Sequence, residues 1–172
     1  RQVDRLMSRQ TTVPMNCIDK VLLSYEIGQQ HMSFHLILSI EGFIDQDRLS
    51  RALLSVLRLH PTMRTIVCSS LFWSRRKVQE NPEHRFPRIV EKNDMSVALG
   101  SDGSQSQYSK RIREWINRPF DPRRELPVRV LILTTGEAEC SVVFTFHHSA
   151  IDGLRAVGFI EEVLATYDRQ DI

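Results

Sequence analysis

Apolar and polar residues alternate along the stretch from Phe34 to Glu41, which reads FHLILSIE. A period of two predicts a strand with one well-buried face. The next stretch changes to helical spacing, because apolar residues recur every three or four positions after the acidic residues Asp45 and Asp47 and stop before Pro61. Acidic residues favour a first helical turn and proline ends a helix, so we expect a helix between them. Its apolar stripe is Leu49, Ala52, Leu53, Val56 and Leu57.

Further elements follow from the same two periods. Strands are expected at 63–68, 88–91, 127–133 and 142–146, and helices at 108–116 and 154–167. The last two strands are separated by so few residues that they should form an antiparallel hairpin. Interleaved strands and helices with one hairpin predict an α/β fold, a two-layer sandwich with a mixed, partly antiparallel sheet. No linker divides the 172 residues, so we expect a single unit over 1–172.

Composition excludes several classes of protein. The chain is 41% apolar with a net charge of only +2, which supports a packed core and gives no basic face for nucleic acid. Two basic clusters, Arg75-Arg76-Lys77 and Arg123-Arg124, are interpreted as solvated loops, with contact to the phosphates of a CoA-type donor as the alternative. Three widely spaced cysteines fit neither a disulfide framework nor a zinc knuckle.

The ends and apolar runs of the chain bear on its location. The opening residues RQVDRLMSRQ do not resemble a signal peptide, and no apolar run approaches the roughly 20 residues that cross a bilayer. We therefore expect a cytoplasmic protein without a membrane span. The first residue is Arg, so we expect the chain to be trimmed at its front.

The segment HHSAIDG, residues 147–153, carries the candidate chemistry. It leaves the end of a predicted buried strand, a common position for functional residues. Imidazole is mostly unprotonated at neutral pH, so His148 is a candidate general base. Asp152 is either the orienting carboxylate of a triad or a structural anchor. Gly153 permits an unusual backbone conformation or a close approach.

Two other interpretations of these residues stay open. A histidine at a strand end is often only a hydrogen-bonded loop residue. His147, His148 and Asp152 also include the residue types that bind zinc. Adjacent histidines at a strand end tend to point to opposite sides, however, which makes a shared metal difficult, and we expect none.

Three motifs together resemble one family. Residues 147–153 match HHxxxDG, residues 58–65, RLHPTMRT, resemble RHxxLRT with Met63 in place of Leu, and residues 119–129, PFDPRRELPVR, resemble FDxxxxPLxR with Val128 in place of Leu. These are the motifs of the superfamily of condensation domains and chloramphenicol-acetyltransferase-like acyltransferases. The opening lacks the aromatic-rich start expected of a peptide-synthetase condensation domain, which favours a stand-alone or polyketide-associated enzyme.

The resemblance implies a role for each motif residue. His148 would be the base that deprotonates the acceptor, and His147 would be mainly structural. Asp152 would turn away from the substrate and pair with Arg64, which replaces the triad interpretation. Gly153 would lie beside the reacting carbonyl.

The implied reaction moves an acyl group directly from a thioester, on CoA or on the phosphopantetheine of a carrier protein, to an alcohol or amine. No acyl-enzyme forms, so Ser149 and Cys140 are expected to be loop and packing residues. No tightly bound cofactor is implied; the partners are a small-molecule acceptor and possibly an acyl or peptidyl carrier protein.

Family members have two lobes with the active site between them, and this chain is expected to supply the N-terminal lobe only, with the C-terminal lobe absent. An exposed apolar face and little activity in isolation would follow. Two alternatives remain: a non-catalytic condensation-like module that docks a carrier protein or partner, and an unrelated α/β domain with a chance motif.

Overall fold

A computed structural model describes residues 11–15, 17–18, 20–22, 32–69, 74–85, 89–95, 104–134 and 139–169. In chain order the elements are β1 (Thr12–Pro14), β2 (Ser33–Glu41), α2 (Gln46–Leu59), the 3-10 helix η2 (Pro61–Arg64), β3 (Thr65–Ser69), β4 (Ser74–Val78), α3 (Pro82–Arg85), β5 (Val90–Asp94), α4 (Ser104–Ile116), β6 (Val128–Thr134), β7 (Glu139–His147) and α5 (Gly153–Arg169).

The larger sheet is mixed and has the strand order β2-β7-β6-β5. β7 pairs antiparallel with both β2 and β6, whereas β5 pairs parallel with β6. Val130 and Phe144 face each other across the β6–β7 hairpin, and both are fully buried. The predicted α/β class, the mixed sheet and the hairpin are confirmed. β7 lies in the interior of this sheet, so the HHSAIDG segment leaves from a rigid strand.

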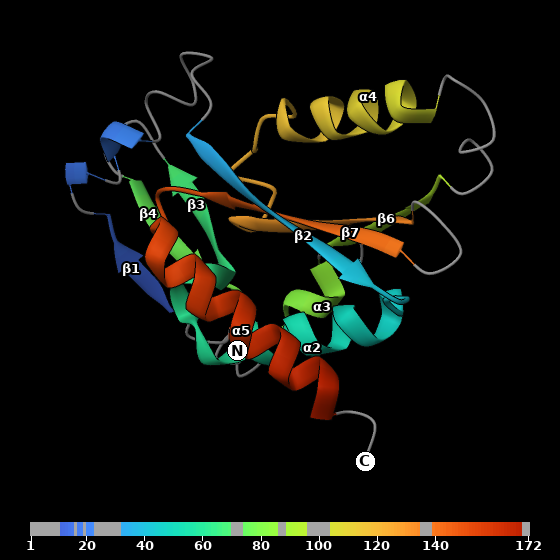
Figure 1. Cartoon of the computed structure of the whole chain (residues 1–172). Helices are drawn as coiled ribbons and strands as arrows, with labels where there is room; N and C mark the ends of the chain where they lie inside the picture. Colours follow the sequence, from blue (N-terminus) through green and yellow to red (C-terminus); the bar gives the residue numbers. More distant parts are fainter. Residues whose placement is uncertain are drawn as a thin grey trace.

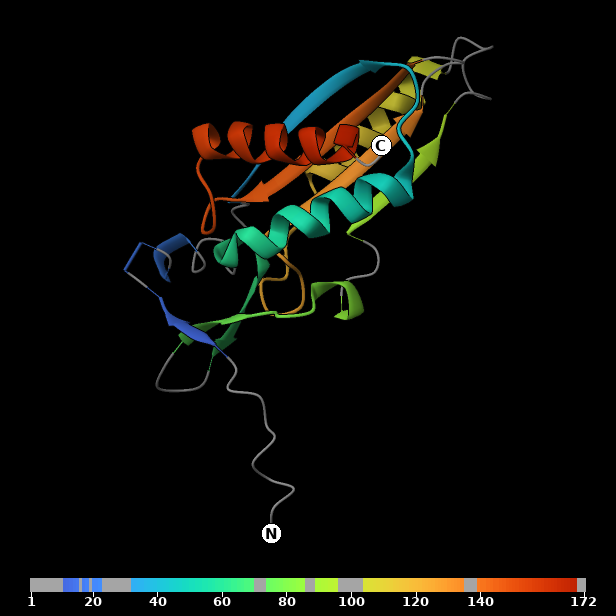
Figure 2. The ribbon, with the colours of Figure 1, turned by 90° about the horizontal axis from the view of Figure 1, so that it is seen from below.

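Helices cover the larger sheet on both faces (Figure 1). α2 and α5 pack side by side against one face, where they form the main apolar core with β6 and β7 (Figure 2). α4 lies on the other face and buries Trp115 against a smaller cluster that includes Leu131, Leu133 and Val143. The prediction of two layers did not include the layer that α4 adds.

A short chain of hydrogen bonds lies beneath α4. The indole N–H of Trp115 donates to Thr145 Oγ1 at 2.9 Å, and Thr145 Oγ1 lies 3.0 Å from Nδ1 of His35. An indole nitrogen can only donate, so the Thr145 oxygen accepts from it and is free to donate its own proton to the imidazole. Burial, followed by the charge of Arg129, lowers the pKa of His35, which favours the neutral ring that this arrangement needs.

The predicted stripe of α2 is buried at every position. Asp45 caps the helix by accepting a hydrogen bond from the backbone N–H of Arg48 at 2.6 Å. The Arg48 guanidinium in turn donates to the carbonyl of Tyr167 near the end of α5, with Nε at 2.8 Å. A cap at one helix is thereby tied to the last turn of its neighbour, which fixes α2 against α5.

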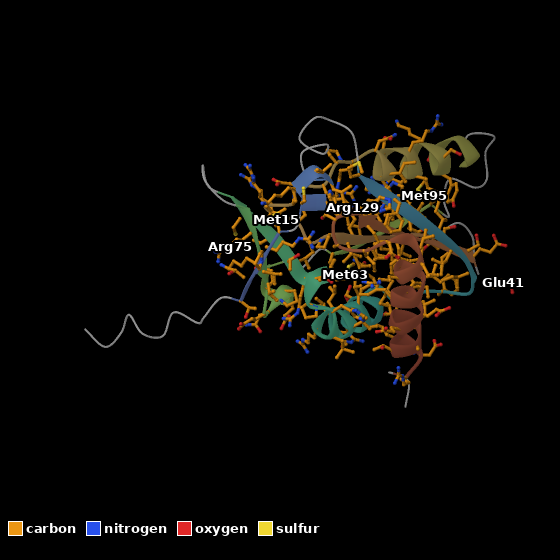
Figure 3. The ribbon with its side chains drawn as sticks, turned by 90° about the vertical axis from the view of Figure 1, so that its left-hand side faces the viewer. Met15, Glu41, Met63, Arg75, Met95 and Arg129 are labelled. Atoms are coloured by element: carbon orange, nitrogen blue, oxygen red, sulfur yellow. The ribbon has the colours of Figure 1, made fainter. Side chains whose placement is uncertain are left out.

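A second, three-stranded sheet has the order β1-β4-β3 and lies beside the larger one (Figure 1). The strand predicted at 63–68 begins only at Thr65, because Pro61–Arg64 form a 3-10 helix that starts with proline. Met63 is buried in that turn, where the small sheet meets α2 (Figure 3). Strands β1 and β4 were not predicted.

The helix predicted at 154–167 is α5, and it buries only part of its apolar residues. Leu154 is 86% exposed and Val157 is 45% exposed, whereas Ala156, Phe159, Ile160, Val163 and Tyr167 are buried. The first turn of α5 therefore presents apolar side chains to solvent directly after the motif. No helix among the described residues has the length and apolar character to cross a bilayer.

Candidate active site

The HHSAIDG segment begins inside the sheet and turns out of it after His147. The backbone N–H of His147 donates to the carbonyl of Pro127 at 3.0 Å, on the β6 side. The N–H of His148 donates to the carbonyl of Met32 at 2.8 Å, on the β2 side. The N–H of Ala150 returns to the carbonyl of His147 at 3.0 Å and closes a turn. Backbone bonds to both neighbouring strands therefore set where the two imidazoles can lie.

His147 has a buried side chain, 1% exposed, whose ring belongs to the interior of the turn. Its Nδ1 accepts a hydrogen bond from the backbone N–H of Ser149 at 3.1 Å, and the Ser149 hydroxyl lies 2.7 Å from the same nitrogen. A backbone N–H can only donate, so Nδ1 carries no proton and the imidazole is the neutral Nε2–H tautomer. The ring edge packs against Phe120, with 5.8 Å between centroids.

His148 is exposed, in contrast to its neighbour. Its ring lies against Phe34 of β2 with 4.5 Å between centroids, and Phe34 stacks on the buried Phe146. Neither ring nitrogen of His148 makes a hydrogen bond to a residue that the structure describes. Both nitrogens are therefore open to a substrate, while the aromatic contact restricts where the ring can point.

Asp152 caps helix α5 and orients no histidine. Its Oδ1 accepts a hydrogen bond from the backbone N–H of Arg155 at 2.9 Å, and its Oδ2 lies 3.7 Å from Nε of the same residue. The side chain of Asp152 is 64% exposed. This geometry supports a structural anchor and does not form the carboxylate–histidine contact of a triad.

The predicted Arg64–Asp152 ion pair does not form between these two described residues. Arg64 closes the 3-10 turn, and its Nη1 donates to the carbonyl of Gln79 at 3.0 Å, while the N–H of Gln79 donates to the carbonyl of Arg64 at 2.8 Å. Arg64 therefore joins the start of β3 to the end of β4, and Asp152 bends back onto its own helix. The Asp152 carboxylate is 64% exposed, so it is not a buried partner of Arg64.

Gly153 is the first residue of α5 and has ordinary helical surroundings. Gly42 is the only glycine with positive φ among the described residues, so Gly153 needs no unusual backbone conformation. A Cβ built on Gly153 would meet no atom within 4 Å. The position is open to solvent, which leaves room for the close approach that the resemblance implies.

Arg76 contacts the motif directly, and the sequence interpretation missed it. The Arg75-Arg76-Lys77 cluster lies on strand β4 and not in a loop, with Arg76 only 6% exposed. Its Nη2 donates to the carbonyl of Ser149. The signal available in the sequence was the alternation in SRRKV, which turns Arg76 and Val78 to the buried side of a strand.

The two histidines do not form a metal centre with Asp152. His147 is buried and faces Ser149 and Phe120, whereas His148 is exposed and faces Phe34. Within the described ranges, no three side chains of His, Cys, Asp or Glu are grouped so as to hold an ion.

Comparisons with known proteins agree on one family. The model of the Condensation domain family matches residues 20–171. The chain is 25% identical over 132 residues to a probable non-canonical nonribosomal peptide synthetase, CymA, of Salinispora arenicola, covering 77% of this chain and 2% of that protein. It is 23% identical over 174 residues to surfactin synthase subunit 2 of Bacillus subtilis, covering 99% of this chain and 4% of that protein. These relatives are synthetases, not the stand-alone or polyketide-associated enzymes that the opening residues favoured.

Solved structures show the same fold. A double mutant of the starter condensation domain of rhizomide synthetase RzmA, in complex with C8-CoA and Leu-SNAC, has a TM-score of 0.75 at 17% identity and covers 95% of this chain. The first condensation domain of the calcium-dependent antibiotic synthetase, in complex with a substrate analogue, has a TM-score of 0.71 at 17% identity and covers 89% of this chain. The present chain spans 36% of each of these two chains.

Proposed function

Because the chain belongs to the condensation-domain family, we propose that it is the N-terminal lobe of a two-lobe acyltransferase in which His148 is the general base. The observation that carries the proposal is the environment of His148. Its imidazole is exposed at the end of a buried strand, is held by Phe34 and leaves both ring nitrogens open. A general base must come within hydrogen-bond reach of the acceptor, and an exposed ring with both nitrogens open allows that contact.

In the proposed reaction, an acyl group arrives as a thioester on CoA or on the phosphopantetheine of a carrier protein. A ring nitrogen of His148 removes the proton of an acceptor hydroxyl or amine while the oxygen or nitrogen forms a bond to the thioester carbonyl carbon. The carbon–sulfur bond then breaks, and the leaving thiolate takes the proton from the imidazolium. The products are an ester or amide and a free thiol, so the step needs no redox partner and no acyl-enzyme.

Two observations bear on the donor. A solved relative, the RzmA starter domain, was crystallised with C8-CoA, so an acyl-CoA is a reasonable first donor to test here. The motif ends at Gly153, the open first residue of α5, and the exposed Leu154 that follows suits the apolar part of a donor. The second wall of the site would come from the C-terminal lobe, and we expect the 172 residues alone to release little or no thiol.

The decisive experiment measures acceptor-dependent thiol release from acyl-CoA and from an acylated carrier protein, using the two-lobe protein that contains this chain. His148→Ala should lower the rate about 10²- to 10⁴-fold, the usual contribution of a general base. His60→Gln is the matched control, because the His60 ring lies 2.8 Å from Glu162 and packs against Phe159, both on α5. Full activity in His148→Ala would refute the proposal; no activity with either donor in the unmodified protein would favour a non-catalytic docking module.

A further inference from the structure

Arg76 is a buried cation on a strand of the small sheet, and its guanidinium reaches the motif. Its Nη2 donates to the carbonyl of Ser149, the residue that follows His148. On β4, Arg76 pairs in register with Val13 of β1 and with Val67 of β3. The backbone of Arg76 is therefore fixed from both sides, so its side chain extends from a defined point toward the turn.

The turn after β7 has few other anchors. The N–H of His148 is held by the carbonyl of Met32, and the side chain and N–H of Ser149 are held by His147. These bonds fix the donors of the turn, whereas the Ser149 carbonyl needs a donor from elsewhere in the fold. Arg76 supplies it, and a bond from a charged donor is about twice as strong as one between neutral groups.

The surroundings of Arg76 show why its removal should matter locally. A hollow of about 310 Å³ lies between β1, η2 and the motif turn, and Arg76 lines it together with Val13, Thr65 and Ser149. A smaller hollow of about 10 Å³ is lined by Arg76 together with His147 and Phe120. Arg76, Thr65 and Ser149 line both hollows, so loss of the guanidinium would leave the turn beside a larger open space.

We infer that Arg76 is a positioning residue for the proposed reaction, holding the Ser149 carbonyl and thereby the placement of the His148 imidazole. A buried guanidinium carries a desolvation penalty, which an apolar side chain in this strand would avoid. The bond to the Ser149 carbonyl offsets part of that penalty. This inference rests on the proposed function of His148. It means that the small sheet, through Arg76, helps to orient the proposed base.

The first test compares Arg76→Met with Arg75→Met in the two-lobe protein. Met keeps most of the stem and removes the donor, and Arg75 is the exposed neighbour on the same strand (Figure 3). Arg76→Met should lower kcat roughly 10- to 100-fold, the effect of misplacing a catalytic group by about 1 Å, with little change in KM. Arg76→Lys should fall between the two, since it keeps a charge but not the reach of the guanidinium. Wild-type kcat in Arg76→Met would overturn the inference.

The second test does not depend on activity. Hydrogen exchange at the amides of 148–150 should become about tenfold faster in Arg76→Met than in Arg75→Met, because the turn loses a charge-assisted anchor. Amides of α2 should be unaffected, which separates a local change from a loss of the fold. Equal exchange in the two variants would overturn the inference even if the enzyme were slow.

The third test is chemical rescue. Arg76→Ala would join the guanidinium's space to the larger hollow, so millimolar guanidinium ions added to the assay should restore part of kcat. They should restore none in His148→Ala, which keeps the two ideas distinguishable: full activity in His148→Ala refutes the proposed function, whereas an inactive His148→Ala with wild-type behaviour in every Arg76 variant refutes only the role of Arg76.

Discussion

The imidazole of His148 lies against the ring of Phe34, with 4.5 Å between the two ring centroids and 36° between their planes. Phe34 continues the contact inward, because it stacks on Phe146, and Phe146 packs edge-on against Phe159 of α5. An exposed histidine is therefore braced by aromatic rings that end in the main core. The proposed base is held by packing, where a triad would use a carboxylate.

Phe34→Leu should test whether the aromatic contact of Phe34 positions the His148 imidazole. Leu fills part of the volume and keeps β2 apolar, but it removes the flat surface under the imidazole. We expect kcat in the two-lobe protein to fall about tenfold, as the near-attack position of the base becomes less populated. Phe43→Leu, at a 64% exposed position just beyond the same strand, is the control and should leave kcat unchanged. An unchanged rate in Phe34→Leu would mean that the aromatic contact does not position His148.

Asp152 and Arg64 should contribute independently to stability. Asp152→Ala removes a helix cap and should cost about 1 kcal/mol, while Asp152→Asn, which caps equally well, should cost almost nothing. Arg64→Ala removes the bond to the Gln79 carbonyl. Denaturant unfolding of both single variants and the double variant should give additive losses. A coupling energy above about 0.5 kcal/mol would show that the two residues interact after all.

Gly153→Ala should leave the fold intact and report on the substrate. Nothing lies within 4 Å of the added methyl group, and its backbone is not left-handed, so the melting temperature should not fall. If the reacting carbonyl passes close to this residue, kcat/KM should drop while stability is kept. A variant with unchanged stability and unchanged kcat/KM would exclude close approach at this point.

Acid should destabilise the fold through His35. Its pKa is lowered in the folded chain by burial and by Arg129, so the unfolded chain binds the proton more readily. The stabilising effect is present above the unfolded pKa, about 6.5, and is lost as the pH falls through the folded value. His35→Gln keeps an acceptor for the Thr145 hydroxyl and should flatten this part of the curve. Denaturant midpoints measured between about pH 7.5 and 5 would test it, and equal slopes for both proteins would contradict it.

Cys140 should be inert toward thiol reagents in the folded protein. It is buried, and burial raises the pKa of its thiol, so little thiolate forms at neutral pH. Cys17 is exposed and should react at once. Mass spectrometry after brief treatment with iodoacetamide should find label on Cys17 and none on Cys140. Rapid labelling of Cys140 would reopen the question of a cysteine nucleophile.

The sequence predicted the larger sheet well, because each of its inner strands is a run of branched and aromatic residues such as VRVLIL. It did not predict β1, which has only three residues, or β4, whose SRRKV reads as polar until a partner strand buries one side of it. The periodicity of the local sequence is enough to predict the inner strands of the larger sheet. β1 and β4 become strands through pairing with other segments, which local periodicity does not show. The same limit explains the partner of Arg64: which acceptor a long side chain reaches depends on segments that the sequence pattern does not place.

The pairing of β2 with β7 has a consequence for biosynthesis. His35 and Thr145, which face each other in this ladder, are 110 residues apart in the chain. A ribosome adds about 5 to 20 residues per second, so a nascent β2 waits roughly 5 to 20 s before its partner exists. During that delay an apolar strand with an unpaired edge is exposed to other nascent chains. Among the described strands β7 comes last in the chain, and His148 follows it directly, so a translation product that stops before β7 would lack both the complete four-stranded sheet and the proposed base.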